Sequence, residues 1–204
     1  DITWLDAADA ENINDHIKPN TKMIFCESPT NPLCKTLDIA ALRNAADKSG
    51  AMLIVDNTFA TPYHQKPLEQ GAHIVVHSAT KGLGGHNDLM AGAVAGSKED
   101  YDKLWFTRQA IGTTLDAYSG SLLERGLKTF RMRAERMAAN AQAVAEYLES
   151  HSGISKVYYP GLKSDPGHET ASRQMQNGFG GMLAFDVGDN QEQAKDFVSR
   201  LKVI

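Results

Sequence analysis

The sequence predicts an α/β fold built on a mostly parallel sheet. Several short apolar runs in the 204-residue chain are rich in β-branched side chains and lie near turn residues, which is typical of buried strands. Helical patterns alternate with these runs and dominate the second half of the chain. At roughly 150 residues per domain, the length predicts one domain, or one domain and part of a second.

Four candidate strands occupy the first half, at residues 23–26, 52–55, 73–77 and 91–95. A helical pattern over residues 38–46 lies between the first two strands, and Gly50 is placed to end that helix as its left-handed C′ residue. A short helix is expected at residues 67–70, just before the third strand.

The second half is predicted to be mainly helical. Residues 119–150 carry an apolar stripe at helical spacing, which Gly126 is expected to weaken or bend. Shorter elements follow, with strands at 157–159 and 182–185, a helix at 192–201 and a strand opening at Val203 and Ile204. We expect a domain boundary near Met132, which divides residues 1–131 from residues 132–204.

Composition excludes several classes of protein. The chain carries 21 Lys and Arg against 25 Asp and Glu, a formal charge of −4, which gives no electrostatic footprint for nucleic acid or an anionic membrane. No apolar run approaches the roughly 20 residues that span a bilayer. Cys26 and Cys34 form no CxxC pair, so we expect no disulfide scaffold and a cytoplasmic setting.

The two ends of the sequence predict that it is the middle of a longer protein. The chain begins at Asp1 without a methionine or a signal-peptide pattern, and it stops shortly after an amphipathic run. We therefore expect parts of a functional site to lie outside it.

Polar side chains follow two of the predicted strands. Asp56 comes directly after the second strand, where ligands bind in open α/β sheets, although a carboxylate there can also cap a turn. Ser78, Thr80 and Lys81 follow the third strand. If the backbone stays extended, Ser78 and Thr80 point to one face and can donate to a phosphate. Lys81 is then either a nucleophile or a solvated lysine.

The glycine-rich segment after Lys81 does not match two common nucleotide-binding patterns. Residues 82–88 match neither the phosphate loop nor the three-glycine dinucleotide pattern, so the glycines are expected to let the backbone fold tightly around Lys81. His73 and His77 lie four residues apart on a strand, about 13 Å, which is too far for one metal ion.

Four arginines with interleaved glutamates predict a solvated or interface face; they are Arg125, Arg131, Arg133 and Arg136.

Taken together, these stretches resemble the pyridoxal-phosphate enzymes of Cys and Met metabolism. The matching segments are residues 27–32, 55–59 with Pro62, 76–81 with Gly85 and His86, 125–129, 159–162 and 180–182. The resemblance covers nearly the whole chain, with matching spacing between motifs. It implies the aspartate-aminotransferase-like fold (fold type I), a mostly parallel sheet with helices on both faces, followed by the start of a smaller C-terminal α/β domain.

The resemblance also implies a cofactor, pyridoxal 5′-phosphate, and a role for each site residue. Lys81 would form the covalent link to the cofactor and act as the catalytic base. Asp56 would keep the pyridinium nitrogen protonated, and physical reasoning agrees, because a carboxylate favours the charged form of that ring. Ser78 and Thr80 would hold the phosphate, and Asn31 would hydrogen-bond the 3′-oxygen.

The implied activity is C–S bond chemistry on sulfur amino acids or homoserine esters, of the cystathionine γ-synthase or cystathionine β- or γ-lyase type. Methionine γ-lyase and O-acetylhomoserine sulfhydrylase are alternatives within the family. A decarboxylase or aminotransferase with the same lysine, and a catalytically inactive fragment, are alternatives of other classes. The implied partners are a small amino-acid substrate and further copies of the chain, as a dimer of dimers.

Two positions depart from the family pattern, and several parts of the site are absent. Gly82 replaces the usual aromatic residue and His73 the usual aspartate, which changes the packing behind Lys81. The resemblance places the residues that complete the phosphate site and stack on the ring upstream of Asp1. It places the clamp for the substrate carboxylate downstream of the chain.

Overall fold

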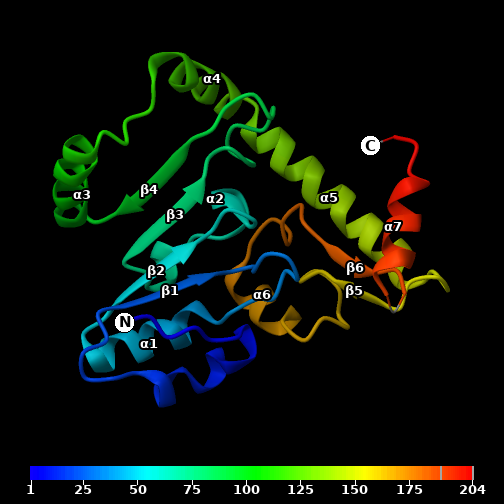
Figure 1. Cartoon of the computed structure of the whole chain (residues 1–204), viewed down its shortest axis with the longest axis horizontal. Helices are drawn as coiled ribbons and strands as arrows, with labels where there is room; N and C mark the ends of the chain where they lie inside the picture. Colours follow the sequence, from blue (N-terminus) through cyan, green and yellow to red (C-terminus); the bar gives the residue numbers. More distant parts are fainter. Residues whose placement is uncertain (189, 204) are drawn as a thin grey trace.

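A four-stranded sheet forms the centre of the first half of the protein (Figure 1). The computed structural model describes residues 1–188 and 190–203, without the side chains of Ala8 and Glu11. The strands lie in the order β1 (Met23–Glu27), β2 (Met52–Asp56), β3 (Ile74–Ser78) and β4 (Gly92–Gly96). The first three are parallel, and β4 runs antiparallel to β3. The four predicted strands and the mostly parallel sheet are thus confirmed.

One face of this sheet is covered by η1 (Ala7–His16) and α1 (Ile39–Ser49). Strand residues such as Leu53 and Val55, both fully buried, pack there against Ile39 and Leu42 of the helix. The predicted helix is confirmed together with its end, because Asp38 caps its N-terminus and Gly50 ends it at φ 68°.

Two short helices lie between β2 and β3. They are α2 (Thr61–His64) and the 3₁₀ helix η2 (Pro67–Gln70), the second at the predicted position. Both help to carry the chain from the carboxyl end of β2 back to the start of β3.

The second half contains more helices than the patterns predict. Its elements are α3 (Lys98–Ile111), α4 (Ala117–Leu127), α5 (Phe130–Glu149), β5 (Lys156–Tyr158), α6 (His168–Gln174), β6 (Ala184–Asp186) and α7 (Gln191–Ser199). The region expected to be one helix over 119–150 is two helices, which separate at Lys128 and Thr129 rather than at Gly126. The sequence patterns did not indicate η1, α2, α3 or α6.

β5 and β6 pair antiparallel as a separate two-stranded sheet beside α5 and α7 (Figure 1). A second core cluster lies here, around the fully buried Tyr159. The strand expected to open at Val203 and Ile204 is not formed at Val203, and Ile204 lies outside the described residues.

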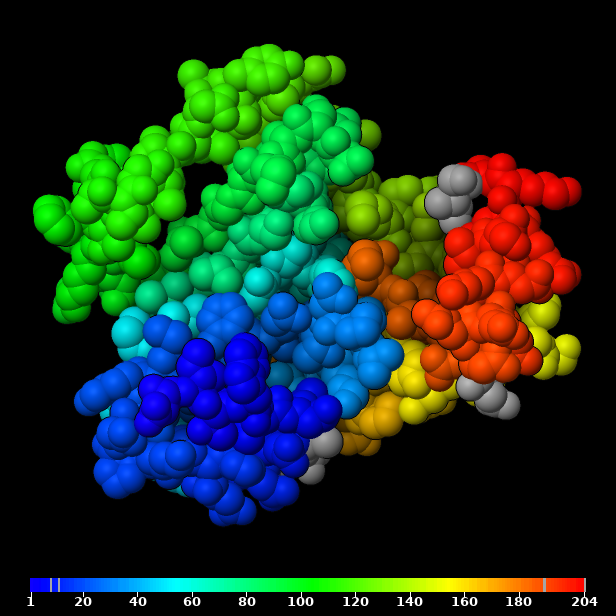
Figure 2. Space-filling view, viewed as in Figure 1, coloured from blue at the N-terminus to red at the C-terminus, as the bar shows by residue number. Residues whose placement is uncertain are grey.

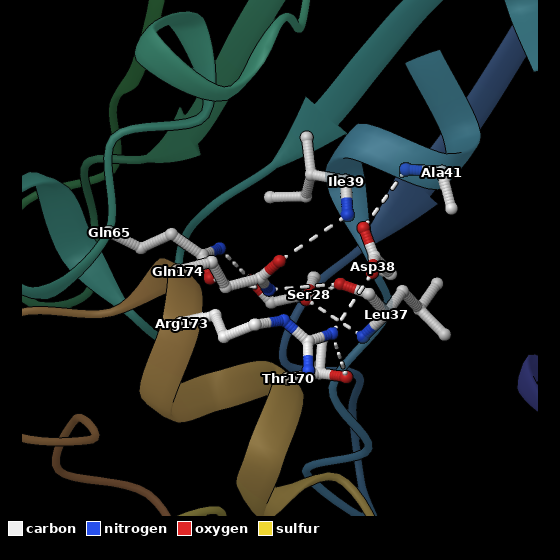
Figure 3. A network of polar contacts seen from close by, with 9 residues as sticks. All are labelled: Ser28, Leu37, Asp38, Ile39, Ala41, Gln65, Thr170, Arg173 and Gln174. Carbon is white, nitrogen blue, oxygen red and sulfur yellow. Dashed lines mark hydrogen bonds and ion pairs between the residues drawn. The ribbon is translucent and has the colours of Figure 1, made fainter. Parts of the chain in front are cut away.

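A polar network joins α6 to the first half of the chain (Figure 3). The amide of Gln174 donates to Gln65 Oε1 at 3.0 Å and to the Leu37 carbonyl at 2.9 Å. The fully buried Gln65 donates in turn to the Ser28 carbonyl at 2.7 Å and to Asn57 Oδ1 at 3.0 Å. The segment after β2 is therefore held by residues that lie far along the chain.

Candidate active site

The carboxyl ends of β2 and β3 bring two of the predicted site residues to one face of the sheet. Asp56 pairs with Val76 and, on the other side, with Glu27. Since Leu53 and Val55 point into the core beneath the sheet, Asp56 points to the opposite face. Ser78 lies two residues after Val76 and shares that face. Its β4 partner is Gly92, which has no side chain to cover Ser78 from that strand, and Ser78 is half-buried.

One oxygen of the Asp56 carboxylate already accepts a hydrogen bond within the protein. Its Oδ1 accepts the Thr58 N–H at 2.9 Å, and Thr58 Oγ1 accepts the Ser78 N–H at 2.8 Å. These bonds tie the ends of β2 and β3 together, so the turn-cap interpretation of Asp56 is confirmed. Oδ2 has no hydrogen bond to any described residue, which leaves one oxygen for a ligand.

The groups around Asp56 make this corner of the sheet anionic. Burial, with the Glu27 and Asp56 carboxylates, raises the pKa of the Cys26 thiol to about 12, so the thiol stays protonated. Burial lowers the pKa of His77, although the nearby Asp56 carboxylate opposes this shift, and the imidazole is therefore mainly neutral at pH 7. Glu27 and Asp56 are register partners and project from the same face, whereas Cys26, the partner of Val55, lies on the core face. The two neighbouring carboxylates favour a cationic group such as a protonated ring nitrogen.

Asn31 lies near the same edge of the sheet, after the end of β1. Its backbone N–H donates to Glu27 Oε2 at 3.0 Å, and Glu27 is the register partner of Asp56. The Asn31 side chain is exposed, and its amide has no hydrogen bond to the described residues.

Lys81 lies in a tight turn that follows β3. The Lys81 N–H donates to the Ser78 carbonyl at 3.1 Å, and the Gly85 N–H donates to the Lys81 carbonyl at 2.8 Å. The glycines thus fold the chain around Lys81 as predicted, whereas the extended backbone assumed for residues 78–81 is wrong. The Lys81 side chain is exposed, and its ammonium group makes no hydrogen bond or ion pair within the described residues.

The hydroxyl of Thr80 is less available than that of Ser78. Thr80 Oγ1 accepts the Ala91 N–H at 3.0 Å and donates to the Ala91 carbonyl at 3.3 Å. This pair of bonds ties the Lys81 turn to the start of β4. A phosphate at Thr80 would have to replace the bond to the Ala91 carbonyl.

The two departures from the family pattern are accommodated by local contacts. A Cβ at Gly82 would come within 2.9 Å of Thr61 Cγ2, so the Thr61 methyl group occupies the place where a larger side chain would begin. His73 Nδ1 accepts the Leu53 N–H at 2.9 Å, which satisfies a backbone donor at the start of the sheet.

The expectation of a solvated arginine face is wrong for one of its four members. Arg125, Arg131 and Arg136 are exposed, and Arg131 pairs with Glu135 at 2.8 Å. Arg133 instead turns inward and donates to the carbonyl oxygens of Gly82 and Leu83, just after Lys81. No local pattern could indicate this contact, because the partners lie about fifty residues apart in the sequence.

Other features of the described residues bear on other classes of site. No group of three or more His, Cys, Asp or Glu side chains that could hold a metal ion is found among them. None of their helices is long and apolar enough to cross a membrane. A cavity of about 510 Å³ lies away from Lys81, beside the start of α3, where Arg43, His73 and Asp100 contribute to its lining.

The family model for the Cys/Met metabolism PLP-dependent enzymes matches residues 1–204. The chain belongs to this family. The resemblance inferred from the motifs is thereby confirmed, and pyridoxal 5′-phosphate is the cofactor that the family implies.

Individual relatives match over nearly the whole chain. A cystathionine gamma-lyase of Bacillus subtilis is 46% identical over 98% of this chain and 53% of its own length. A cystathionine beta-lyase of Lactococcus lactis is 48% identical over 96% of this chain and 52% of its own. The chain thus spans about half the length of the curated relatives it matches.

The crystal structure of metB from Corynebacterium glutamicum superposes with a TM-score of 0.93 at 42% sequence identity. The match covers 99% of this chain and 52% of that one. It confirms the predicted fold class, that of the pyridoxal-phosphate enzymes of fold type I.

The side chains at the end of the sheet fit such a cofactor. An exposed amine at Lys81 suits its aldehyde, and the free oxygen of Asp56 in an anionic corner suits a protonated ring nitrogen. Ser78 is half-buried, and its hydroxyl makes no hydrogen bond within the described residues, so it is available to a phosphate oxygen. Thr80 fits less well, because its hydroxyl is bonded to Ala91.

Proposed function

We propose that this chain carries the cofactor-binding centre of an enzyme that makes or breaks C–S bonds in sulfur amino acids. The reaction would be of the cystathionine γ-synthase or cystathionine β- or γ-lyase type, within transsulfuration. One observation supports this most directly: Asp56 and Ser78 share one face at the end of the sheet, and Lys81 lies in the turn that follows.

Each proposed residue has a task that its surroundings suit. Lys81 would hold the cofactor through its amine, and the same amine would move a proton from the substrate α-carbon to another atom. Its exposed side chain leaves it free to take part in both steps. Asp56 keeps the ring nitrogen protonated, while its other oxygen fixes the turn at Thr58. When bound, pyridoxal phosphate supplies the electron sink that stabilises negative charge on the substrate.

The remaining proposed residues orient the cofactor. Ser78 donates to the phosphate, and Thr80 does so after exchanging its bond to the Ala91 carbonyl. Asn31 hydrogen-bonds the 3′-oxygen. Two things support these roles: the family motif implies them, and each residue lies at or beside the carboxyl ends of β1 and β3.

Other activities of the family remain alternatives. A cystathionine gamma-lyase and a cystathionine beta-lyase match this chain at 46% and 48% identity, so similarity alone does not choose between γ- and β-elimination. Methionine γ-lyase and O-acetylhomoserine sulfhydrylase activity are further candidates. Product analysis with cystathionine, methionine and O-acetylhomoserine separates them.

We further propose that the whole protein acts on a small amino-acid substrate as a dimer of dimers in the cytoplasm. The formal charge of −4 and the free Cys26 and Cys34 support a protein of a reducing compartment that does not bind nucleic acid.

The test of the proposal is to locate the cofactor on the polypeptide. The protein, expressed as its gene encodes it in full, is mixed with pyridoxal phosphate, reduced with borohydride and mapped by mass spectrometry. We expect the pyridoxyl group on Lys81. Lys81→Arg keeps the charge but cannot form the link, so it should carry no label and lose about three orders of magnitude or more in activity. Label on another lysine would overturn the assignment.

A further inference from the structure

The turn that carries Lys81 has few side chains that could stabilise its backbone conformation. Three of the four residues at 82–85 are glycines, which lose more conformational entropy on ordering than any other residue. Gly85 lies at φ 76°, a backbone conformation that side-chain-bearing residues rarely adopt. Apart from Leu83, the segment has no side chain with which to anchor itself, so its conformation depends on contacts from elsewhere.

Arg133, in the first turn of α5, provides those contacts. Its Nη1 donates to the Gly82 carbonyl at 2.8 Å, and its Nη2 donates to the Leu83 carbonyl at 3.2 Å. The same Nη2 donates to the Gly126 carbonyl at 2.9 Å. A single guanidinium group thus joins the Lys81 turn to the end of α4. Hydrogen bonds from a charged donor are stronger than neutral ones.

Three further observations indicate that the guanidinium is committed to this turn. It forms no ion pair with a carboxylate of the described residues, and its Nε donates to Oγ1 of Thr129, the N-cap residue of α5, at 3.2 Å. Burial lowers the pKa of Arg133, as expected for a cation withdrawn from water without a counter-ion. A Cβ at Gly85 would overlap the guanidinium itself, so glycine at this position leaves the space that Arg133 fills.

We propose that Arg133 is a positioning residue for Lys81: by bonding the carbonyls of Gly82 and Leu83, it fixes the turn from which the lysine side chain projects. The inference rests on the proposed role of Lys81. Arg133 acts through the backbone and does not itself bind cofactor or substrate. Removing it should loosen the turn and slow the attachment of the cofactor.

The first measurement needs no cofactor. Amide hydrogen exchange at Gly84 and Gly85 reports directly on the turn, because these N–H groups donate to the carbonyls of Ala79 and Lys81 at 2.8 Å. In the full-length, cofactor-free protein, Arg133→Met should raise exchange at both amides about tenfold. The matched control is Arg131→Met, which removes an exposed arginine two residues away on the same helix and should leave both amides unchanged.

The second measurement follows the attachment of pyridoxal phosphate with time, by borohydride quenching and mapping of Lys81. We expect attachment to be about tenfold slower in Arg133→Met than in the wild type, with Arg133→Lys between them, because an ammonium group keeps the charge but cannot span the same carbonyls. If Arg133→Met fails to fold, Arg133→Lys carries the test. Faster exchange with slower attachment supports the inference.

The outcomes separate the two proposals. Label at Lys81 with wild-type rates in the Arg133 variants would overturn this inference and leave the proposed function standing. Wild-type exchange at Gly84 and Gly85 in Arg133→Met would overturn it as well. Label on a different lysine of the wild-type protein would overturn the proposed function, and the positioning role with it.

Discussion

At the scale of single residues, Asp56 shows how one side chain can satisfy two interpretations of a sequence. An acid directly after a buried strand predicts either a turn cap or a ligand group. In the structure Oδ1 caps the turn at Thr58 while Oδ2 is free of the described residues. A residue fixed by its own cap presents its second oxygen in a set direction, which favours a rigid cofactor contact.

The first residue-scale prediction tests the charge of that oxygen. Asp56→Asn nearly preserves shape and can still accept the Thr58 N–H, but it removes the anion that keeps the ring nitrogen protonated. We expect kcat to fall about a hundredfold with little change in KM, because this interaction matters most in the transition state. Glu27→Gln, at the register partner of Asp56, is the control and should change kcat far less. Steady-state kinetics of the full-length protein that show normal turnover in Asp56→Asn would leave Asp56 as a structural cap only.

Some residue-scale features could be predicted and others could not. Ser78 and Asp56 follow apolar runs, so their place at the sheet edge follows from local pattern. The internal bonds of Thr80 depend on Ala91, eleven residues further on, and those of Arg133 depend on a loop about fifty residues away. A prediction based on residues close together in the sequence cannot indicate either contact.

At the scale of elements, α4 approaches the Lys81 turn more closely than a side chain allows. Gly126, in the last turn of α4, is buried, and a Cβ there would overlap the Gly84 carbonyl. The glycine that was expected to bend a helix instead permits a close contact between α4 and this turn. The helix break follows two residues later, where Thr129 Oγ1 donates back to the Gly126 carbonyl.

Gly126→Ala should therefore destabilise the protein, by about 1–3 kcal/mol, because the backbone must move to admit the methyl group. Gly120→Ala, in the same helix, is the matched control. A Cβ at Gly120 meets nothing within 4 Å, so alanine there should stabilise the helix by about 0.5–1 kcal/mol. Urea unfolding of both variants distinguishes close contact from helix propensity, and equal effects of the two substitutions would contradict the close approach.

A second element-scale prediction concerns the junction between α6 and the segment after β2. Gln65→Leu would leave the Ser28 carbonyl and the Asn57 amide oxygen without the donor that satisfies them in a buried site. We expect a loss of about 2–4 kcal/mol in unfolding free energy. Gln109→Leu, at an exposed position in α3, should change it by less than about 0.5 kcal/mol. Similar unfolding midpoints for the two variants would show that the network contributes little.

The elements that were predicted and those that were missed differ in what they bury. α1 carries an apolar stripe against the sheet and has recognisable caps, so its pattern and its ends both indicate a helix. α3 buries none of its residues, so no single apolar face marks it. α6 has only seven residues and is fixed by contacts with Leu37 and Gln65, far earlier in the chain.

At the scale of the whole molecule, the chain leaves much apolar surface uncovered. Phe25 on β1 and Val94 on β4 are 57% and 58% exposed on a face of the sheet, and Phe106 on α3 is 75% exposed. α3 and α4 stand out at one edge of the molecule (Figure 2). Apolar patches of this kind mark surfaces that associate with other proteins.

The domain boundary at residue 132 stays a prediction. One core cluster lies on each side of it, although α6 packs back onto the first half of the chain.

This surface leads to a prediction about the 204-residue chain expressed alone. Charge-assisted hydrogen bonds to the phosphate are the strongest that the cofactor can make. For these bonds the chain offers Ser78 and Thr80, and the Thr80 hydroxyl is already bonded to Ala91. The resemblance places the other phosphate ligands and the substrate clamp in segments outside it. We expect weak binding of pyridoxal phosphate, no measurable lyase or synthase activity, and aggregation through the exposed faces. Cofactor titration, a cystathionine assay and light scattering, run beside a full-length relative, test this. Tight stoichiometric binding with turnover would mean that Asp56, Ser78 and Lys81, as this fold arranges them, suffice for a working site.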